Sequence, residues 1–187
     1  MKTFAALGIT LALAPVAHAE PTPTQAPDST IAAAVKSISA PHIQADIEKL
    51  ASFGTRSTLS AQDPASIAAG RGVGAAREWL KAQFEAYSKE CGGCLEVKTD
   101  SFVQEPAARV PSPTPLTNVY AVLKGSSPQD AGRIVLVTGH YDSRNTDVLN
   151  TTDDAPGAND DASGTAVSLE SARALSKLKQ LRATVIF

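Results

Sequence analysis

A strand–helix–strand pattern in the last third of the sequence constrains the fold more than any other feature. The apolar run 134–137 leads into a polar turn, an amphipathic helix predicted at 163–180 and a second apolar run at 183–187. Such a βαβ unit places its two strands parallel in one sheet. Unbroken apolar runs also predict strands that are covered on both faces. The sequence therefore predicts an α/β fold with a mixed, largely parallel sheet flanked by helices.

Upstream of this unit, the spacing of apolar residues predicts further helices and strands. Helices are predicted at about 29–53 and 70–89, strands at 95–104 and 118–124, loops at 59–64 and 106–116, and a turn at 125–132. Four prolines in residues 106–116 favour a loop there. The apolar stripe of the helix at 163–180 is predicted to include Val167, Ala174, Leu178 and Leu181.

The first 28 residues differ from the rest of the chain. Lys2, the apolar run 4–16 and the segment Ala17-His18-Ala19 have the order of a secretory signal peptide and its cleavage site. Residues 20–28, which are rich in proline and threonine, predict a flexible linker. We therefore expect cleavage near Ala19 and a secreted or periplasmic chain, with residues 29–187 forming an α/β domain.

Charge and hydropathy exclude two classes of partner. The formal net charge is −2 and the sequence pI is about 5.9, so the chain has no basic footprint for nucleic acid. Apart from the N-terminal run, no apolar segment approaches the length of a membrane span. We expect no nucleic-acid partner and, once the signal peptide is removed, no membrane association.

The two cysteines, Cys91 and Cys94, enclose a Gly-Gly pair. This spacing is compatible with a local disulfide, with thiol redox chemistry or with half of a zinc site. A second cysteine pair is absent from the sequence, and export would place the chain in an oxidising compartment. A disulfide that closes a tight turn is therefore the favoured interpretation.

Polar residues with metal-binding chemistry follow the predicted strand at 134–137. His140 and Asp142 lie just beyond it, and Asp160 lies in the turn that leads to the next helix. In a parallel sheet, the carboxyl ends of the strands gather ligands at one edge, so we expect His140 and Asp160 to lie close together. Imidazole and carboxylate are ordinary zinc ligands. Asp142 is placed to accept the second ring N–H of His140.

Each of these residues also has a purely structural interpretation. The acidic residues of the turn region would then cap the following helix and solvate a surface loop. These residues are Asp153, Asp154, Asp160 and Asp161, and either Asp161 or Ser163 is a candidate cap. His140 would then be a strand-end histidine that is hydrogen-bonded to the backbone. The order of the residues and the predicted topology together favour the metal site.

Two segments resemble a known family. Gly139-His140-Tyr141-Asp142-Ser143 and the turn from Pro156 to Gly164, with twenty residues from His140 to Asp160, resemble the secreted co-catalytic di-zinc aminopeptidases. These enzymes are relatives of bacterial leucyl aminopeptidase and aminopeptidase S. The segments 52–56 and 117–125 also look familial, and the resemblance runs from about residue 40 to the end of the chain.

The resemblance implies a site with two zinc ions. His140 would bind one zinc, Asp160 would bridge both, and Asp142 would act in catalysis by orienting His140. The peptide bond between Asp160 and Asp161 would be cis. The substrate would be a peptide or protein with a free N-terminus, and a glutamate would serve as general base.

The chain departs from this family pattern at its C-terminal end. The paired glutamates and the remaining ligands of the family follow the strand that begins near Ala183, and none of them occurs before Phe187. We therefore expect a domain that is truncated within its sheet, an exposed apolar surface and an inactive chain. A non-catalytic peptidase-like binding module and a zinc acyltransferase resembling glutaminyl cyclase are alternatives to the aminopeptidase.

Overall fold

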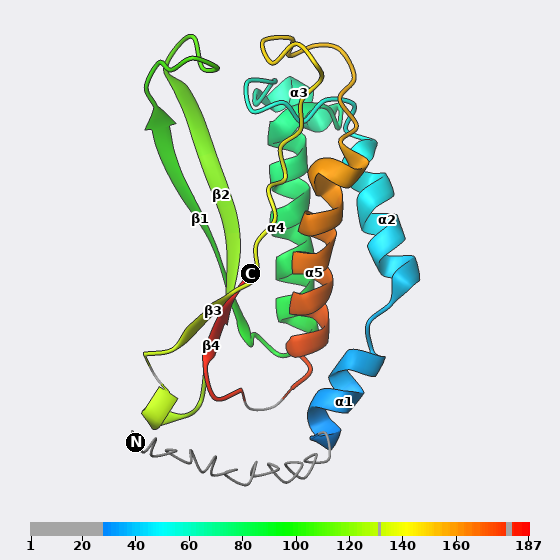
Figure 1. The fold of residues 1–187 in the computed structure, drawn as a ribbon, viewed down its shortest axis with the longest axis vertical. Helices are drawn as coiled ribbons and strands as arrows, with labels where there is room; N and C mark the ends of the chain where they lie inside the picture. Colours follow the sequence, from blue (N-terminus) through cyan, green and yellow to red (C-terminus); the bar gives the residue numbers. More distant parts are fainter. Residues whose placement is uncertain (1–27, 131, 179–180) are drawn as a thin grey trace, which may run out of the picture.

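The computed structural model describes residues 28–130, 132–178 and 181–187 (Figure 1). The predicted signal peptide and residues 20–27 of the predicted linker lie outside the described residues. Among the helices in the described ranges, we find none with the length and apolarity needed to cross a membrane.

The fold combines helices with one mixed sheet, as the sequence predicts. The helices are α1 (Ser29–Lys36), α2 (Ala40–Ala51), α3 (Pro64–Ala68), α4 (Gly72–Glu90) and α5 (Ser163–Leu175). The strands are β1 (Leu95–Gln104), β2 (Thr114–Leu123), β3 (Ile134–Leu136) and β4 (Thr184–Ile186), and two short helical turns, η1 and η2, cover Pro128–Asp130 and Ala158–Ala162. In Figure 1, α4 and α5 stand side by side next to the sheet, and α2 lies beyond α5.

The sheet has the strand order β1-β2-β4-β3 within the described residues. The pair β3 and β4 is parallel and is joined through α5, so the predicted βαβ unit is confirmed. The other two pairings are antiparallel. β1 and β2 form one long ribbon, and β4 pairs with the end of β2. The parallel part of the described sheet is therefore confined to β3 and β4, and the expectation of a largely parallel sheet does not hold for this part of the chain.

The predicted helix at 29–53 is two helices. Asp28 caps α1, and the Ser39 side chain caps α2 by accepting the backbone N–H of His42. Pro41 lies in the first turn of α2, where its missing N–H costs no hydrogen bond. Serine competes with the helical backbone for hydrogen bonds, and the two helices meet at such a residue.

Two predicted loops extend past the start of the next element. The loop predicted at 59–64 ends in the short helix α3, where the Asp63 carboxylate accepts N–H groups of the first turn. Strand β2 begins at Thr114, inside the proline-rich segment. Pro115 pairs with Val103 in register. Its ring nitrogen faces away from β1, as does the N–H of Ala121 that bonds to Phe187, so β1 loses no hydrogen bond.

Helix α5 ends earlier than the spacing of apolar residues predicts. It ends at Leu175, so Leu178 and Leu181 of the predicted stripe lie beyond it. Ala174 is buried, but Val167 is 53% exposed. The residues that face the core are Ala166, Leu169 and Ala172, which share one face at helical spacing. The predicted stripe is therefore wrong at Val167, and its last two members lie beyond the end of the helix.

Strand β3 is exposed in this structure, although its apolar sequence predicts cover on both faces. Ile134, Val135 and Leu136 are 59%, 46% and 64% exposed. β3 is the edge strand of the described sheet and pairs only with β4 there. The strand prediction is confirmed, and the predicted burial is wrong for the described residues.

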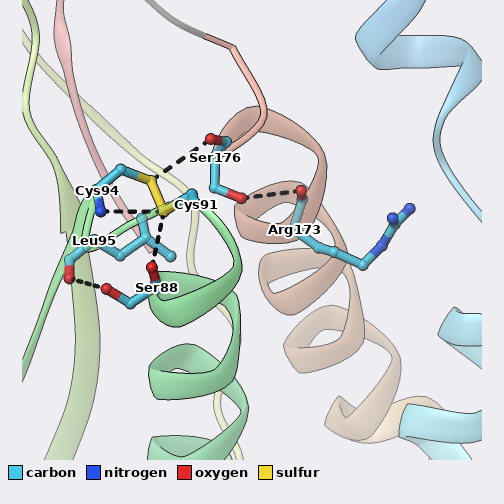
Figure 2. The surroundings of a disulfide bond; sticks show 6 residues. All are labelled: Ser88, Cys91, Cys94, Leu95, Arg173 and Ser176. Carbon is cyan, nitrogen blue, oxygen red and sulfur yellow. Dashed lines mark hydrogen bonds between the residues drawn. A yellow bond between two sulfur atoms is a disulfide. The ribbon is translucent and has the colours of Figure 1, made fainter.

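The disulfide prediction is confirmed. Cys91 and Cys94 are joined by a disulfide, with their Cα atoms 5.6 Å apart, where α4 turns into β1 (Figure 2). Gly92 and Gly93 adopt positive φ angles of 75° and 87°, which the turn requires. The Sγ of Cys94 lies 3.6 Å from the carbonyl oxygen of Ser176, so the closed turn also contacts the end of α5.

A buried polar cluster fastens α5 to the link between α1 and α2. Glu170, which is 1% exposed, accepts hydrogen bonds from Arg173 and from the backbone N–H of Ser39. Arg173 also donates to the carbonyl oxygen of Ser37. Asp46 lies in the same interface with one carboxylate oxygen that has no hydrogen-bond partner among the described residues. This interface is therefore held by charge as well as by packing.

Leu169 tests the corrected apolar face of α5. It is fully buried in the core cluster, so we expect Leu169→Ala to lower the free energy of unfolding by about 2–5 kcal/mol. Val167→Ala, on the exposed side of the same helix, should change it by no more than about 0.5 kcal/mol. Urea denaturation followed by circular dichroism measures both. Equal losses for the two variants would contradict the assigned face.

Asp46 predicts an unusual pH dependence of stability. Burial, together with the charge of Glu170, raises the pKa of Asp46 from 3.8 to about 6, although His42 and Arg173 oppose the shift. The folded chain therefore binds this proton more tightly than the unfolded chain, and the contribution to stability grows as pH falls from above 6 towards 4.

Asp46→Asn should remove this pH dependence. We expect the variant to be more stable than the parent near pH 7, by up to about 3 kcal/mol, because one pKa unit corresponds to about 1.4 kcal/mol. The two proteins should converge in stability near pH 4. Urea denaturation at several pH values measures the difference, and a variant that is less stable at every pH would contradict the assignment.

Candidate metal centre

The segment that carries His140 runs against the start of α5. Gly139 permits this close approach, because a Cβ atom there would lie 2.4 Å from the carbonyl carbon of Gly164 and from the backbone nitrogen of Thr165. Any larger residue would push the segment away from the helix. The position of His140 therefore depends on backbone packing between this segment and α5.

The turn that carries Asp160 is closed by a second glycine. Gly157 has a φ of 45°, in the left-handed region, and a Cβ there would lie 2.6 Å from the Cβ of Ser143. The peptide bond between Asp160 and Asp161 is cis, as the family resemblance implies. The turn therefore packs directly on the segment that follows β3.

The structure brings the three predicted site residues together. Nδ1 of His140 lies 3.0 Å from Oδ1 of Asp142, and Nε2 lies 3.1 Å from Oδ1 of Asp160. The imidazole is therefore flanked by one carboxylate on each ring nitrogen. The side chains of His140 and Asp160 are 58% and 77% exposed, so this pair faces open space.

The surrounding charges favour the protonated form of His140 when no metal is bound. Burial opposes the ring charge, but the hydrogen bond and charge of Asp142, together with the charge of Asp161, outweigh it. As a result the pKa of His140 is raised above 6.5. A metal ion at Nε2 would have to displace this proton, so metal affinity should fall as pH falls through the raised pKa.

Asp161 connects His140 to α5. One carboxylate oxygen accepts the backbone N–H of His140 at 3.0 Å, and the other accepts the N–H of Gly164 in the first turn of α5 at 3.0 Å. The predicted helix-capping role of Asp161 is confirmed, whereas the Ser163 hydroxyl donates to the carbonyl oxygen of Asn159 instead. The link from Asp161 to the histidine backbone has no signal in the sequence.

Arg56 is a site-supporting residue whose role the sequence does not reveal. Its guanidinium is completely buried and donates only to backbone carbonyl oxygens. The acceptors are Tyr141 at 2.8 Å, Leu50 at 2.7 Å, Pro156 at 2.7 Å and Gly157 at 3.1 Å. One side chain thus joins the end of α2, the His140 segment and the Asp160 turn. Its only sequence signal is its place in the familial segment 52–56.

Thr58 is a second residue that the sequence does not single out. Its hydroxyl donates a hydrogen bond to Oδ2 of Asp142, the carboxylate oxygen that His140 leaves free. Ser57 forms a bridge with Ser143 in parallel orientation, which aligns this segment with the one that carries His140. Asp142 is therefore held from two sides.

The remaining acidic residues of this region support the loop. Asp154 pairs with Arg71 at 3.0 Å, and Asp153 accepts a hydrogen bond from the Asn150 amide. The structural interpretation of the acidic turn therefore applies to these two residues, whereas Asp160 and Asp161 contact the histidine.

The donor types fit part of a zinc site. His140 Nε2 and the Asp160 carboxylate are both zinc-ligand types and face each other, while Nδ1 is engaged by Asp142. Within residues 28–130, 132–178 and 181–187, however, no cluster of three or more His, Cys, Asp or Glu side chains is arranged to hold a metal. His42 is elsewhere, 3.8 Å from Glu170. These residues fit two ligands of a larger set.

The sequence comparisons match this region to a protease family. Residues 118–187 match the family model described as Peptidase family M28. A probable zinc metalloprotease of Leptosphaeria maculans is 48% identical over 161 residues, which are 86% of this chain and 36% of that protein. A probable zinc metalloprotease of Pyrenophora teres f. teres is also 48% identical, over 87% of this chain and 32% of its own length. The chain thus spans about a third of the length of these curated relatives.

Solved structures show the same fold at lower sequence identity. A leucine aminopeptidase precursor from Bacteroides thetaiotaomicron is 19% identical, with a TM-score of 0.55 over 81% of this chain and 46% of that one. The Fimbriiglobus ruber glutaminyl cyclase is 20% identical, with a TM-score of 0.59 over 80% of this chain and 44% of that one. At these identities the likeness shows the fold alone, and it is shared by peptidases and cyclases.

Arg56 provides a test of how the site is assembled. Arg56→Lys keeps the charge but loses the planar fork, so buried carbonyl oxygens are left without donors. We expect the free energy of unfolding to fall by at least about 2 kcal/mol, because each such group costs about 1–3 kcal/mol. Chemical denaturation measures this loss.

Arg71→Lys is the matched control. The Arg71 side chain is 47% exposed and pairs with Asp154 at the surface, so we expect a loss below about 1 kcal/mol. A loss for Arg56→Lys as small as that of the control would show that the buried fork does not hold the segments together.

Proposed function

Because residues 118–187 of this chain match the model of Peptidase family M28, we propose that the chain carries part of the active site of a zinc-dependent aminopeptidase. In this proposal His140 and Asp160 would be ligands of a site for two zinc ions, and Asp142 would orient His140. One observation carries the proposal: the imidazole of His140 lies between Asp142 on Nδ1 and Asp160 on Nε2.

Zinc, when bound, would polarise the scissile carbonyl group and lower the pKa of a water molecule. The residues of this chain would prepare the site for it. Asp142 would hold the His140 proton on Nδ1 and leave the lone pair of Nε2 free. The carboxylate of Asp160 lies on the Nε2 side of the ring and is open to the surroundings.

The proposed substrate is a peptide or protein with a free N-terminus. A pocket beside His140 is lined partly by the apolar side chains of Phe102, Leu116 and Val119, which suit an apolar part of such a substrate. The curated relatives support peptide hydrolysis over the cyclisation of N-terminal glutamine, since both are probable zinc metalloproteases. The N-terminal sequence supports export of the protein after cleavage near Ala19.

We further propose that the chain alone has little or no activity. Its described residues bring together His140 and Asp160 but no third group suited to a metal ligand. Two protein ligands should bind zinc weakly, and the Nδ1 partner Asp142 does not add a ligand. Catalysis would therefore require further ligands and a general base.

Zinc titration by isothermal calorimetry tests the ligand assignment. We expect weak binding of zinc by the chain, loss of this binding in His140→Ala and Asp160→Ala, and weaker binding at low pH because the raised pKa of His140 favours its protonated form. His42→Ala is the matched control and should bind as the parent does. Unchanged binding in His140→Ala would overturn the ligand role, and tight binding of two ions would contradict the incomplete set.

A chimera tests the reaction. In it, residues 28–187 replace the matching third of the Leptosphaeria maculans relative. We expect it to release p-nitroaniline from amino-acid p-nitroanilides, to leave peptides with N-terminal glutamine uncyclised, and to lose about 10–100-fold of its activity in Asp142→Asn. Cyclisation without hydrolysis would favour the cyclase, and a chimera that lacks both activities while the unaltered relative hydrolyses would favour a non-catalytic module.

A further inference from the structure

The outer oxygen of Asp142 has its own hydrogen-bond donor. The Thr58 hydroxyl donates to Oδ2, while Oδ1 faces Nδ1 of His140 at 3.0 Å. An ionised carboxylate only accepts hydrogen bonds, so both the hydroxyl and the ring nitrogen must supply protons to it. The hydroxyl of Thr58 and the ring of His140 therefore both donate to Asp142, one to each carboxylate oxygen.

The backbone holds Thr58 in place. Its neighbour Ser57 pairs with Ser143, and the backbone N–H of Arg56 donates to the Ser143 hydroxyl at 3.1 Å while the Ser143 N–H donates to the Arg56 carbonyl at 2.9 Å. Both Ser57 and Ser143 are buried. The Thr58 hydroxyl thus belongs to a segment whose backbone is hydrogen-bonded to the segment that carries Asp142.

This arrangement favours Nδ1 as the nitrogen that carries the proton of a neutral His140. The proton of a neutral imidazole goes to the nitrogen with the better-placed acceptors, and the other nitrogen keeps its lone pair. Nδ1 faces two acceptors of Asp142, Oδ1 at 3.0 Å and the carbonyl oxygen at 3.3 Å, and Thr58 holds this carboxylate in place. Nε2 faces one carboxylate oxygen, that of Asp160 at 3.1 Å, whose side chain is 77% exposed. If Oδ2 lost its donor, the carboxylate would be free to rotate away from Nδ1, and only the longer contact would remain.

We propose that Thr58 is a positioning residue that acts through Asp142 to keep the proton of neutral His140 on Nδ1 and its Nε2 available to zinc. The inference rests on the proposed function for its zinc part alone. The tautomer of His140 is a property of the metal-free chain and is measured without metal.

Nitrogen-15 NMR of the histidine rings tests the proposal. The sequence has three histidines, His18, His42 and His140, so the two ring-nitrogen shifts of His140 are assigned by comparison with His140→Gln. At alkaline pH and without metal, we expect the parent to show the Nδ1–H form. Thr58→Val should shift the ring towards a mixture of both tautomers, and Thr58→Ser, which keeps the hydroxyl, should restore the parent spectrum.

Thr99→Val is the matched control. Thr99 is exposed on β1, and the same replacement there should leave the His140 shifts unchanged. Thr58→Ala provides a second variant without the hydroxyl, and thermal unfolding identifies which variants are folded. A folded Thr58→Val or Thr58→Ala protein with the parent spectrum would overturn the inference.

Zinc titration of the same proteins separates the two proposals. We expect the loss of the Thr58 hydroxyl to weaken zinc binding about 10–100-fold, as observed for residues that support metal ligands. Unchanged zinc affinity in a variant with mixed tautomers would overturn the zinc part of the inference. A tautomer shift in Thr58→Val with no zinc binding by any protein, the parent included, would contradict the proposed function and leave the tautomer assignment supported.

Discussion

The buried guanidinium of Arg56 is the interaction on which the site depends most. Burial of a charged group is costly unless its hydrogen-bonding capacity is used, and burial here lowers the pKa of Arg56. The cost is offset by four backbone carbonyl oxygens contributed by three separate segments of the chain. Two of these segments, the His140 segment and the Asp160 turn, are irregular and lack the regular hydrogen-bond ladders of helices and strands, and the guanidinium supplies part of that order. The side chain thus sets the distance between the His140 segment and the Asp160 turn.

Further contacts connect the segments that Arg56 joins to the side chains of the candidate site. Ser57 and Ser143 hold two extended segments together, Thr58 and His140 flank Asp142, and Asp161 fixes the histidine backbone to α5. The exposed imidazole is therefore held at its backbone and at Nδ1, while Nε2 faces the exposed carboxylate of Asp160. A site built this way combines solvent access with a fixed orientation, as metal ligation requires.

The sequence predicts most of the regular elements and the proximity of His140 to Asp160, because both leave local patterns. Periodicity predicts the βαβ unit, and residue type together with topology predicts that His140 lies near Asp160. The roles of Arg56 and Thr58 are not predictable in this way. Apart from Leu50, the partners of these two side chains are more than eighty residues away in the chain. The Arg56 guanidinium also donates only to backbone carbonyl oxygens, which every residue carries. The predicted burial of β3 was also wrong. An apolar sequence shows that a strand is suited to burial, but it does not show that another element packs against it.

Asp161 has a consequence for the energetics of the whole chain. Its carboxylate is shared between the His140 backbone and the first turn of α5, the helix whose Leu169 lies in the centre of the core. Occupancy of the site and integrity of the core are therefore thermodynamically linked, since a ligand that binds only the folded state stabilises that state by mass action. A substitution that destabilises the core beneath α5 should consequently weaken ligand binding, even if the substituted residue does not contact the ligand.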